Sequence, residues 1–141
     1  ELDEERQLVD DFLREIMQAH PKATYGEMMI RSALDQGAVA TLLLSESLRK
    51  RRTVYKCRQC KHEWTVTTEG AVDIPDCVDC GAAADQVRED EAASVDLVDE
   101  LSIIAGQSSA TVRLISTDTE EGATLKEAFG GMAALLRWAW S

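Results

Sequence analysis

The sequence predicts an α/β protein in which helices cover a sheet, with a small cysteine-rich insert. Helical and strand patterns alternate along the chain on both sides of the insert, and such alternation is typical of a helix-covered sheet. All four cysteines lie within residues 57–80. With 141 residues, of which 45% are apolar, the chain is long enough for one domain with its own core and a small insert.

Two helices are expected before the first strand. The first covers residues 8–17 and ends before Pro21, because apolar side chains recur at helical spacing and polar ones fill the other face. The second lies within 24–37, where Thr24 and Glu27 fit a capping box and Gly37 a left-handed C-terminal cap. The positions expected to be buried are Leu8, Val9, Phe12, Leu13, Ile16, Met17, Met29, Ile30, Ala33 and Leu34.

Three strands and two more helices are expected in the rest of the chain. The apolar run at 38–45 predicts a strand buried on both faces, and the β-branched run at 109–116 predicts a second strand. A helix ends at Gly106, a short helix covers 117–131, and an apolar strand covers 132–140. Without the cysteine segment, the expected order is α-α-β-α-β-α-β. The apolar faces of the later helices contain Val95, Val98, Leu101 and Ile104, and then Leu125 and Phe129.

The cysteines form two Cys-x-x-Cys pairs that are separated by 16 residues. This spacing is that of a four-thiolate zinc ribbon, in which each tight turn presents two sulfurs to one ion. The sequence therefore predicts one structural Zn²⁺ whose closed shell leaves no place for a catalytic water. Residues 61–76 offer a hairpin and little core, so folding of the insert is expected to depend on the metal. The predicted ligands are Cys57, Cys60, Cys77 and Cys80.

Other readings of the cysteines stay open at this point. Free or disulfide-forming cysteines are the plain alternative, and iron in a rubredoxin-like site would use the same ligands. A dithiol redox centre needs only one Cys-x-x-Cys beside a helix, which is not the setting here. His62 is expected to be exposed or to lie behind the ligands, and Trp64 to pack on the small core of the ribbon.

A basic run lies directly before the cysteine segment. It consists of Arg49, Lys50, Arg51 and Arg52, within a stretch at 45–52 that is expected to be a polar connection. The run either contacts ribosomal RNA or an acidic partner, or it is a solvated loop. Tyr55 alone is too little for an aromatic stacking platform.

Composition excludes several functional classes. The net charge of −11 opposes general attraction to phosphate backbones. No apolar run reaches about 18 residues, so no membrane span is expected. The N-terminal "ELDEERQLVDD" is acidic, which does not fit a secretory signal, and it lacks methionine, which indicates a piece of a longer protein or a trimmed chain.

A search for catalytic residues finds no active site. His20 and His62 lie far in sequence from any plausible nucleophile, and the acidic residues are spread over expected solvent faces. No glycine-rich stretch has a phosphate-binding pattern. The chain is therefore not expected to be an enzyme.

Two long stretches resemble a known family. "YGEMMIRSALDQGAVATLLLSESLR" at 25–49 and "STDTEEGATLKEAFGGMAALLRW" at 116–138 are similar to the C-terminal domain of the archaeal and eukaryotic class 1 peptide chain release factor. The most specific parts are Gly37 to Glu46 and Glu121 to Trp138. The four-cysteine insert resembles the minidomain of archaeal release factors, and Pelota usually lacks it.

The resemblance implies a three-layer α/β/α sandwich of the kind found in Pelota and in kink-turn RNA-binding ribosomal proteins. The sandwich would take 1–54 and 82–141, and the zinc-ribbon minidomain 55–81. The alternative function is that of a Pelota-like or kink-turn RNA-binding protein, which the acidic composition disfavours. A catalytic zinc protein is a third class, and full four-thiolate ligation argues against it.

The resemblance also implies a role in translation termination without catalysis. In this family, stop-codon reading and the Gly-Gly-Gln loop that hydrolyses peptidyl-tRNA belong to other domains. The "AGQ" at Ala105 to Gln107 is expected to be a helix end. The implied partners are a translational GTPase of the archaeal elongation factor 1 alpha type, the ABC-class recycling ATPase and, in the full-length protein, the ribosome. The implied location is cytoplasmic.

Overall fold

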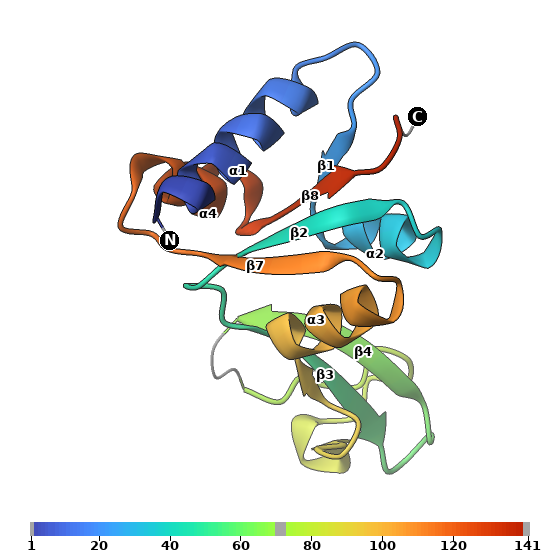
Figure 1. Cartoon of the computed structure of the whole chain (residues 1–141). Coiled ribbons are helices and arrows are strands. Elements are labelled where there is room, and N and C mark those ends of the chain that lie inside the picture. The colour runs from blue at the N-terminus through green and yellow to red at the C-terminus, as the bar shows by residue number, and fades with distance from the viewer. Residues whose placement is uncertain (1, 70–72, 140–141) are drawn as a thin grey trace. The chain divides into compact units, whose positions relative to one another are not determined.

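A computed structural model describes residues 2–69 and 73–139 (Figure 1). The chain divides into two units. The sandwich unit consists of Glu1–Leu48 and Leu101–Ser141, and the ribbon unit consists of Arg49–Glu100. None of the described helices is long and apolar enough to cross a bilayer.

The sandwich unit is built on a four-stranded mixed sheet in the order β1-β8-β2-β7. Its strands are β1 (Ala23–Tyr25), β2 (Val39–Ser45), β7 (Thr111–Ile115) and β8 (Met132–Leu136). Strand β2 runs parallel to β7 and antiparallel to β8. Leu42, Leu43 and Leu44 are fully buried, which confirms the predicted strand with two covered faces.

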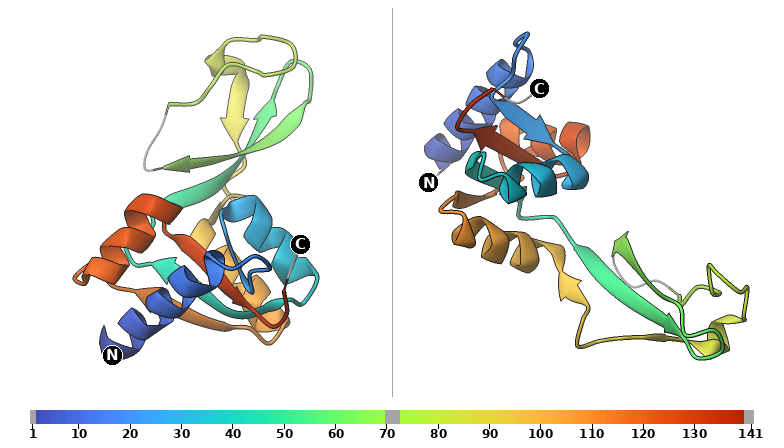
Figure 2. Two further views of the ribbon diagram at one scale, coloured as in Figure 1. Left: turned by 90° about the horizontal axis from the view of Figure 1, so that it is seen from above. Right: turned by 90° about the vertical axis from the view of Figure 1, so that its right-hand side faces the viewer.

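Two helices cover one face of this sheet (Figures 1 and 2). These are α1 (Leu2–Ile16) and α4 (Glu120–Phe129). Alternate strand residues point to the same face, so Leu43 and its register partner Ala133 meet these helices together. The buried core on this side consists of Val9, Phe12, Ala23, Leu43, Ile115, Leu125 and Ala133.

The opposite face is covered by α2 (Glu27–Asp35) and α3 (Leu97–Gln107). The crossovers from β1 to β2 and from β2 to β7 move in the same direction across the sheet, and right-handed crossovers then place both helices on one face. This arrangement is the expected three-layer α/β/α sandwich. Gln107 closes α3, so the "AGQ" stretch is a helix end as predicted.

The start of α2 differs from the prediction. Thr24 belongs to β1, where it pairs with Ala134, and the helix begins after Gly26 without a side-chain cap. The predicted capping box was therefore wrong, because Thr24 lies in a β-strand and not at the N-cap of the helix. Two positions that were predicted to be buried are exposed: Met29 in α2 is 50% exposed, and Met17, which lies beyond the end of α1, is 82% exposed.

The ribbon unit has its own small sheet, with β3 between β4 and β5. Its elements are β3 (Lys50–Cys57), β4 (Glu63–Glu69), the 3-10 turn η1 (Ala84–Gln86), β5 (Val87–Glu89) and β6 (Val95–Asp96), which also pairs with β3. Most of the basic run therefore lies in a strand and not in a connecting loop. The hairpin is formed by β3 and β4 and not within 61–76, of which 70–72 lie outside the described residues.

The ribbon unit is wider than the insert predicted at 55–81. The β3–β4 ladder begins at Lys50, which lies opposite Glu69, and β6 returns to pair with Arg51 and Arg52. The hydrogen-bonded ladder keeps β3 and β6 in one unit, which extends from Arg49 to Glu100 within the first part of α3. In the sandwich unit, β8 ends at Leu136, and Trp140 of the predicted final strand lies outside the described residues.

Candidate metal centre and ribbon surface

The two Cys-x-x-Cys turns have the same backbone hydrogen bonds. In the first, the Lys61 amide donates to the Cys57 carbonyl at 3.0 Å, and the Cys57 amide donates to the His62 carbonyl at 2.9 Å. The second turn repeats the pattern: Gly81 donates to Cys77 at 3.1 Å, and Cys77 to Ala82 at 2.9 Å. The fifth residue of each turn has positive φ, 69° at Lys61 and 74° at Gly81. The repeated geometry turns both cysteine pairs toward one point.

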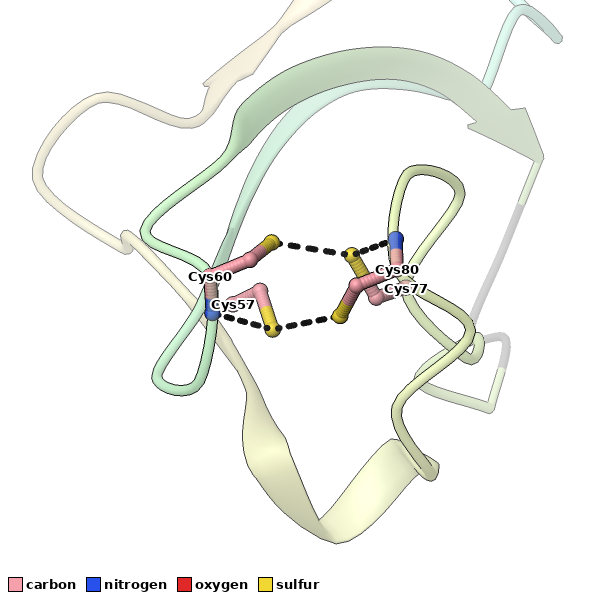
Figure 3. Close-up of side chains that lie close together, drawn as sticks. All are labelled: Cys57, Cys60, Cys77 and Cys80. Carbon is pink, nitrogen blue, oxygen red and sulfur yellow. Dashed lines mark hydrogen bonds between the residues drawn. The ribbon is translucent and has the colours of Figure 1, made fainter.

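The four sulfurs lie within 4.8 Å of one another (Figure 3). Sγ of Cys57 is 3.7 Å from Sγ of Cys80, and Sγ of Cys60 is 3.6 Å from Sγ of Cys77. With Zn–S bonds of about 2.3 Å, the edge of a sulfur tetrahedron is about 3.8 Å. The sulfurs therefore have the spacing of a tetrahedral ligand shell, and they lie too far apart for disulfide bonds of about 2.05 Å.

Backbone amides point at the sulfurs. The Cys60 amide donates to the Cys57 sulfur at 3.5 Å, and the amides of Asp79 and Cys80 donate to the Cys77 sulfur at 3.4 and 3.5 Å. Hydrogen bonds of this kind stabilise thiolates, which are the form that binds a metal. The arrangement offers four anionic sulfur ligands to one cation.

The thiols differ in their proton affinity. The backbone amides of Cys80 and Asp79 lower the pKa of Cys77 to about 6. For Cys60, the His62 amide acts to lower the pKa, but desolvation and hydrogen bonds with the three other sulfurs outweigh it and raise the pKa to about 12. Four crowded thiols therefore do not all ionise easily on their own, and a cation that replaces their protons removes this conflict.

A small core supports the cysteine cluster. Tyr55, Ala82 and Val87 are buried together with Cys57 and Cys77, and Trp64 packs against them, as predicted. His62 stacks on Trp64 with an interplanar angle of 12°. Among the described residues, the group of possible metal-ligand atoms contains only the four cysteines, so His62 is not part of it.

The basic run is paired within the ribbon unit. Arg51 lies 3.8 Å from a carboxylate oxygen of Glu89, and Nε of Arg52 lies 3.1 Å from one of Glu100. Lys50 stands opposite Glu69 in the β3–β4 ladder. Arg49 directly precedes β3. These carboxylates come from β4, β5 and α3. A binding role for the basic run stays a prediction.

Arg88 is a basic residue that the sequence patterns did not single out. Arg88 lies 36 residues after Arg52, the end of the basic run, and β5 brings it directly opposite Lys56 of β3. No local pattern marks this pairing, because it depends on the register of two strands that are distant in sequence.

Comparison with known proteins gives a consistent result. The family model described as eRF1 domain 3 matches residues 2–140. A peptide chain release factor subunit 1 from Thermoplasma acidophilum is 42% identical over 97% of this chain, and one from Methanococcoides burtonii is 41% identical over 95%. The chain spans 32% of the length of each of these relatives.

Solved structures agree with the fold. The C-terminal domain of the peptide chain release factor from Methanosarcina mazei is 38% identical, with a TM-score of 0.78 over 98% of this chain and 84% of that one. The Thermoplasma acidophilum Pelota protein, 18% identical over 97% of this chain and 29% of that one, shares the fold with a TM-score of 0.54. The match over residues 2–140 and the identity to several release factors show that this chain belongs to the eRF1 domain 3 family.

Proposed function

We propose that this chain is the partner-binding, non-catalytic C-terminal domain of a class 1 release factor that acts in translation termination in the cytoplasm. The observation that supports this most strongly is the identity of 42% to a peptide chain release factor subunit 1 over 97% of the chain. A four-sulfur cluster with tetrahedral spacing fits the archaeal form implied by the sequence resemblance.

The arrangement of the site supports a role without catalysis. Among the described residues, the one group of three or more possible metal ligands is the four-cysteine cluster. Four thiolates complete a tetrahedral shell, so no coordination position is left to activate water. The Gly-Gly-Gln sequence that the family uses for peptidyl-tRNA hydrolysis does not occur in the 141 residues.

We further propose that the four sulfurs hold one structural Zn²⁺. Zinc has no geometric preference of its own and accepts four thiolates in a tetrahedron, which the sulfur spacing of 3.6 to 3.7 Å fits. Iron would use the same ligands, and the two metals are distinguished by elemental analysis and by the visible absorption of iron–thiolate sites.

The proposed partners are a translational GTPase of the elongation factor 1 alpha type and an ABC-class recycling ATPase, with the ribosome in the full-length protein. Two proteins that share only the fold give a precedent for factor contacts. Dom34 from S. cerevisiae is described as interacting with Hbs1, and an archaeal Pelota was studied ribosome-bound together with ABCE1.

The test is binding of the purified chain to the archaeal elongation factor in the presence of a non-hydrolysable GTP analogue or of GDP. We expect affinity that depends on the nucleotide state and that persists when the ribbon unit is unfolded by Cys57→Ser, because the partner surface is proposed to lie on the sandwich unit. If the chain instead bound kink-turn RNA with a steep salt dependence and did not bind the GTPase, the kink-turn alternative would be supported.

A further inference from the structure

Three basic side chains share one face of the small sheet in the ribbon unit. Lys56 of β3 and Arg88 of β5 are direct register partners. The Arg58 amide donates to the Gln86 carbonyl at 2.7 Å, which continues the same ladder beyond Cys57. Because side chains alternate between faces, Lys56, Arg58 and Arg88 all project from the face opposite Tyr55 and Cys57. We call these three residues the cation cluster.

The cation cluster lacks the ion pairs that the basic run has. Lys56 and Arg88 carry like charges in directly opposed positions, which is unfavourable in a sheet. Among the described residues, no carboxylate forms an ion pair with either residue or with Arg58. Arg51 and Arg52, in contrast, have Glu89 and Glu100. Glu63 of β4 lies directly opposite Lys56 on the same face, but no ion pair joins them, so an external anion would relieve the remaining repulsion between Lys56 and Arg88.

We propose that the cation cluster binds the phosphate backbone of RNA. Arg58 and Arg88 are exposed and Lys56 is half-buried, so all three are open to a ligand. Lys56 and Arg58 are two residues apart, so the chain separates them by at most about 6.8 Å, which is similar to the step between neighbouring phosphates. The proposal goes beyond factor binding by the sandwich unit, because it assigns a ligand class to the ribbon unit.

The surroundings favour phosphate over a protein partner. The exposed β4 residues on this face are polar: Glu63 lies directly opposite Lys56, and Thr65 and Thr67 follow along the strand, while Val54 on the same face is buried. A protein interface needs an apolar centre, whereas most contacts to nucleic-acid backbones are made by Arg, Lys and hydroxyl groups. The exposed Val66 belongs to the other face, because it lies opposite Thr53.

We expect the cation cluster to bind RNA with modest affinity. With a net charge of −11, the chain as a whole is not attracted to RNA, so binding has to come from the cluster itself. Three phosphate contacts to a single strand predict that log Kobs falls against log[salt] with a slope of about −2. No base is read, so the contact does not depend on RNA sequence.

The test uses the metal-loaded chain and fluorescein-labelled oligouridine, with fluorescence anisotropy measured over a salt series. For the wild type we expect binding at low salt with the slope given above. The double variant Arg58→Gln/Arg88→Gln is expected to weaken binding at least about tenfold at low salt and to reduce the slope by about 1.4, or 0.7 for each lost contact. Arg58→Lys/Arg88→Lys keeps the charges and is expected to retain the slope.

Arg51→Gln is the matched control in the same strand. It also removes one positive charge, but from a side chain paired with Glu89, so the salt slope is expected to stay unchanged. Bound metal is measured in each variant to confirm that the ribbon unit is folded. Absence of RNA binding by the wild type at low salt would overturn the proposal. Equal losses of RNA affinity per removed charge in Arg51→Gln and in the double variant would also overturn it. Binding of polyglutamate as tight as that of RNA would overturn it as well, because it would indicate an acidic protein as the ligand.

Discussion

Gly122 and Ser116 approach so closely that the chain has no room for a side chain between them. A Cβ atom on Gly122 would lie 1.7 Å from the backbone oxygen of Ser116 and 3.1 Å from the hydroxyl of Thr119. That hydroxyl accepts a hydrogen bond of 2.9 Å from the Gly122 amide and caps α4. The glycine therefore lets the loop after β7 fold back on the first turn of α4.

Gly122→Ala is expected to destabilise the sandwich unit by about 3 kcal/mol or more, because the obstacle is a backbone carbonyl and not a flexible side chain. The measurement is chemical denaturation followed by far-UV circular dichroism. Gly106→Ala is the matched control. Gly106 lies exposed in α3 with open space around it, and alanine there is expected to stabilise the unit by about 0.5–1 kcal/mol. Equal stability of the two variants would contradict the steric argument.

Leu43→Asp is expected to unfold the sandwich unit. Leu43 is fully buried in the core beneath α1 and α4, and an unpaired carboxylate there is expected to cost about 4 kcal/mol or more. Leu114→Asp makes the same change on the neighbouring strand at a side chain that is 55% exposed, and it is expected to cost less than about 1 kcal/mol. Melting temperatures of the two variants provide the comparison, and an unchanged value for Leu43→Asp would refute the buried position.

Removal of the metal is expected to unfold the ribbon unit and to leave the sandwich unit folded. The core of the ribbon unit consists of a few side chains around the cysteines and does not suffice without the metal. Cys57→Ser, or a chelator, should reduce the bound metal from one ion per chain and collapse the amide resonances of the ribbon unit alone. Val78→Ser, at an exposed non-ligand position in the second turn, should retain the metal. Simultaneous loss of the resonances of both units would show that they do not fold independently.

Arg137 is expected to stabilise the sandwich unit through the backbone. Its guanidinium donates to the carbonyls of Val39, Ser108 and Ser109, each at 3.1 Å, and so connects the end of β8 to β2 and to the turn after α3. Arg137→Gln is expected to cost about 1–2 kcal/mol in urea unfolding. Arg14→Gln removes an exposed arginine that pairs with Asp11 within α1, and it is expected to cost less than about 0.5 kcal/mol. A cost for Arg137→Gln no larger than this would show that the backbone bonds contribute little.

The sequence predicted a structural feature correctly where the feature depends on the residues of one short segment. The spacing of the cysteines predicted that their four sulfurs gather at one point, because each pair lies in a turn whose geometry depends on a few consecutive residues. The run "AVATLLLS" predicted β2, since a strand covered on both faces needs apolar side chains at every position. The left-handed conformation predicted at Gly37, where φ is 68°, was equally local.

Pairing between distant segments could not be read in the same way. Thr24 fits a helix cap as well as a strand, and only its pairing with Ala134 decided between them. The basic run looked like a loop because its charges are continuous, and its partners, Glu89 in β5 and Glu100 in α3, follow about 40 to 50 residues later. Charge neutralisation across a sheet depends on register, which is set by the whole unit and not by neighbours in sequence.

The sequence by itself therefore determined the class of the fold, the cluster of four cysteines and the family, because these depend on local periodicity, spacing and similarity. The tertiary structure decided the extent of the ribbon unit, the pairing of Arg51 and Arg52, and the proximity of Lys56 to Arg88. The physical reason is that hydrogen-bonded strands bring together side chains from distant parts of the chain, so that the fold determines which charges are paired and which are left for a ligand.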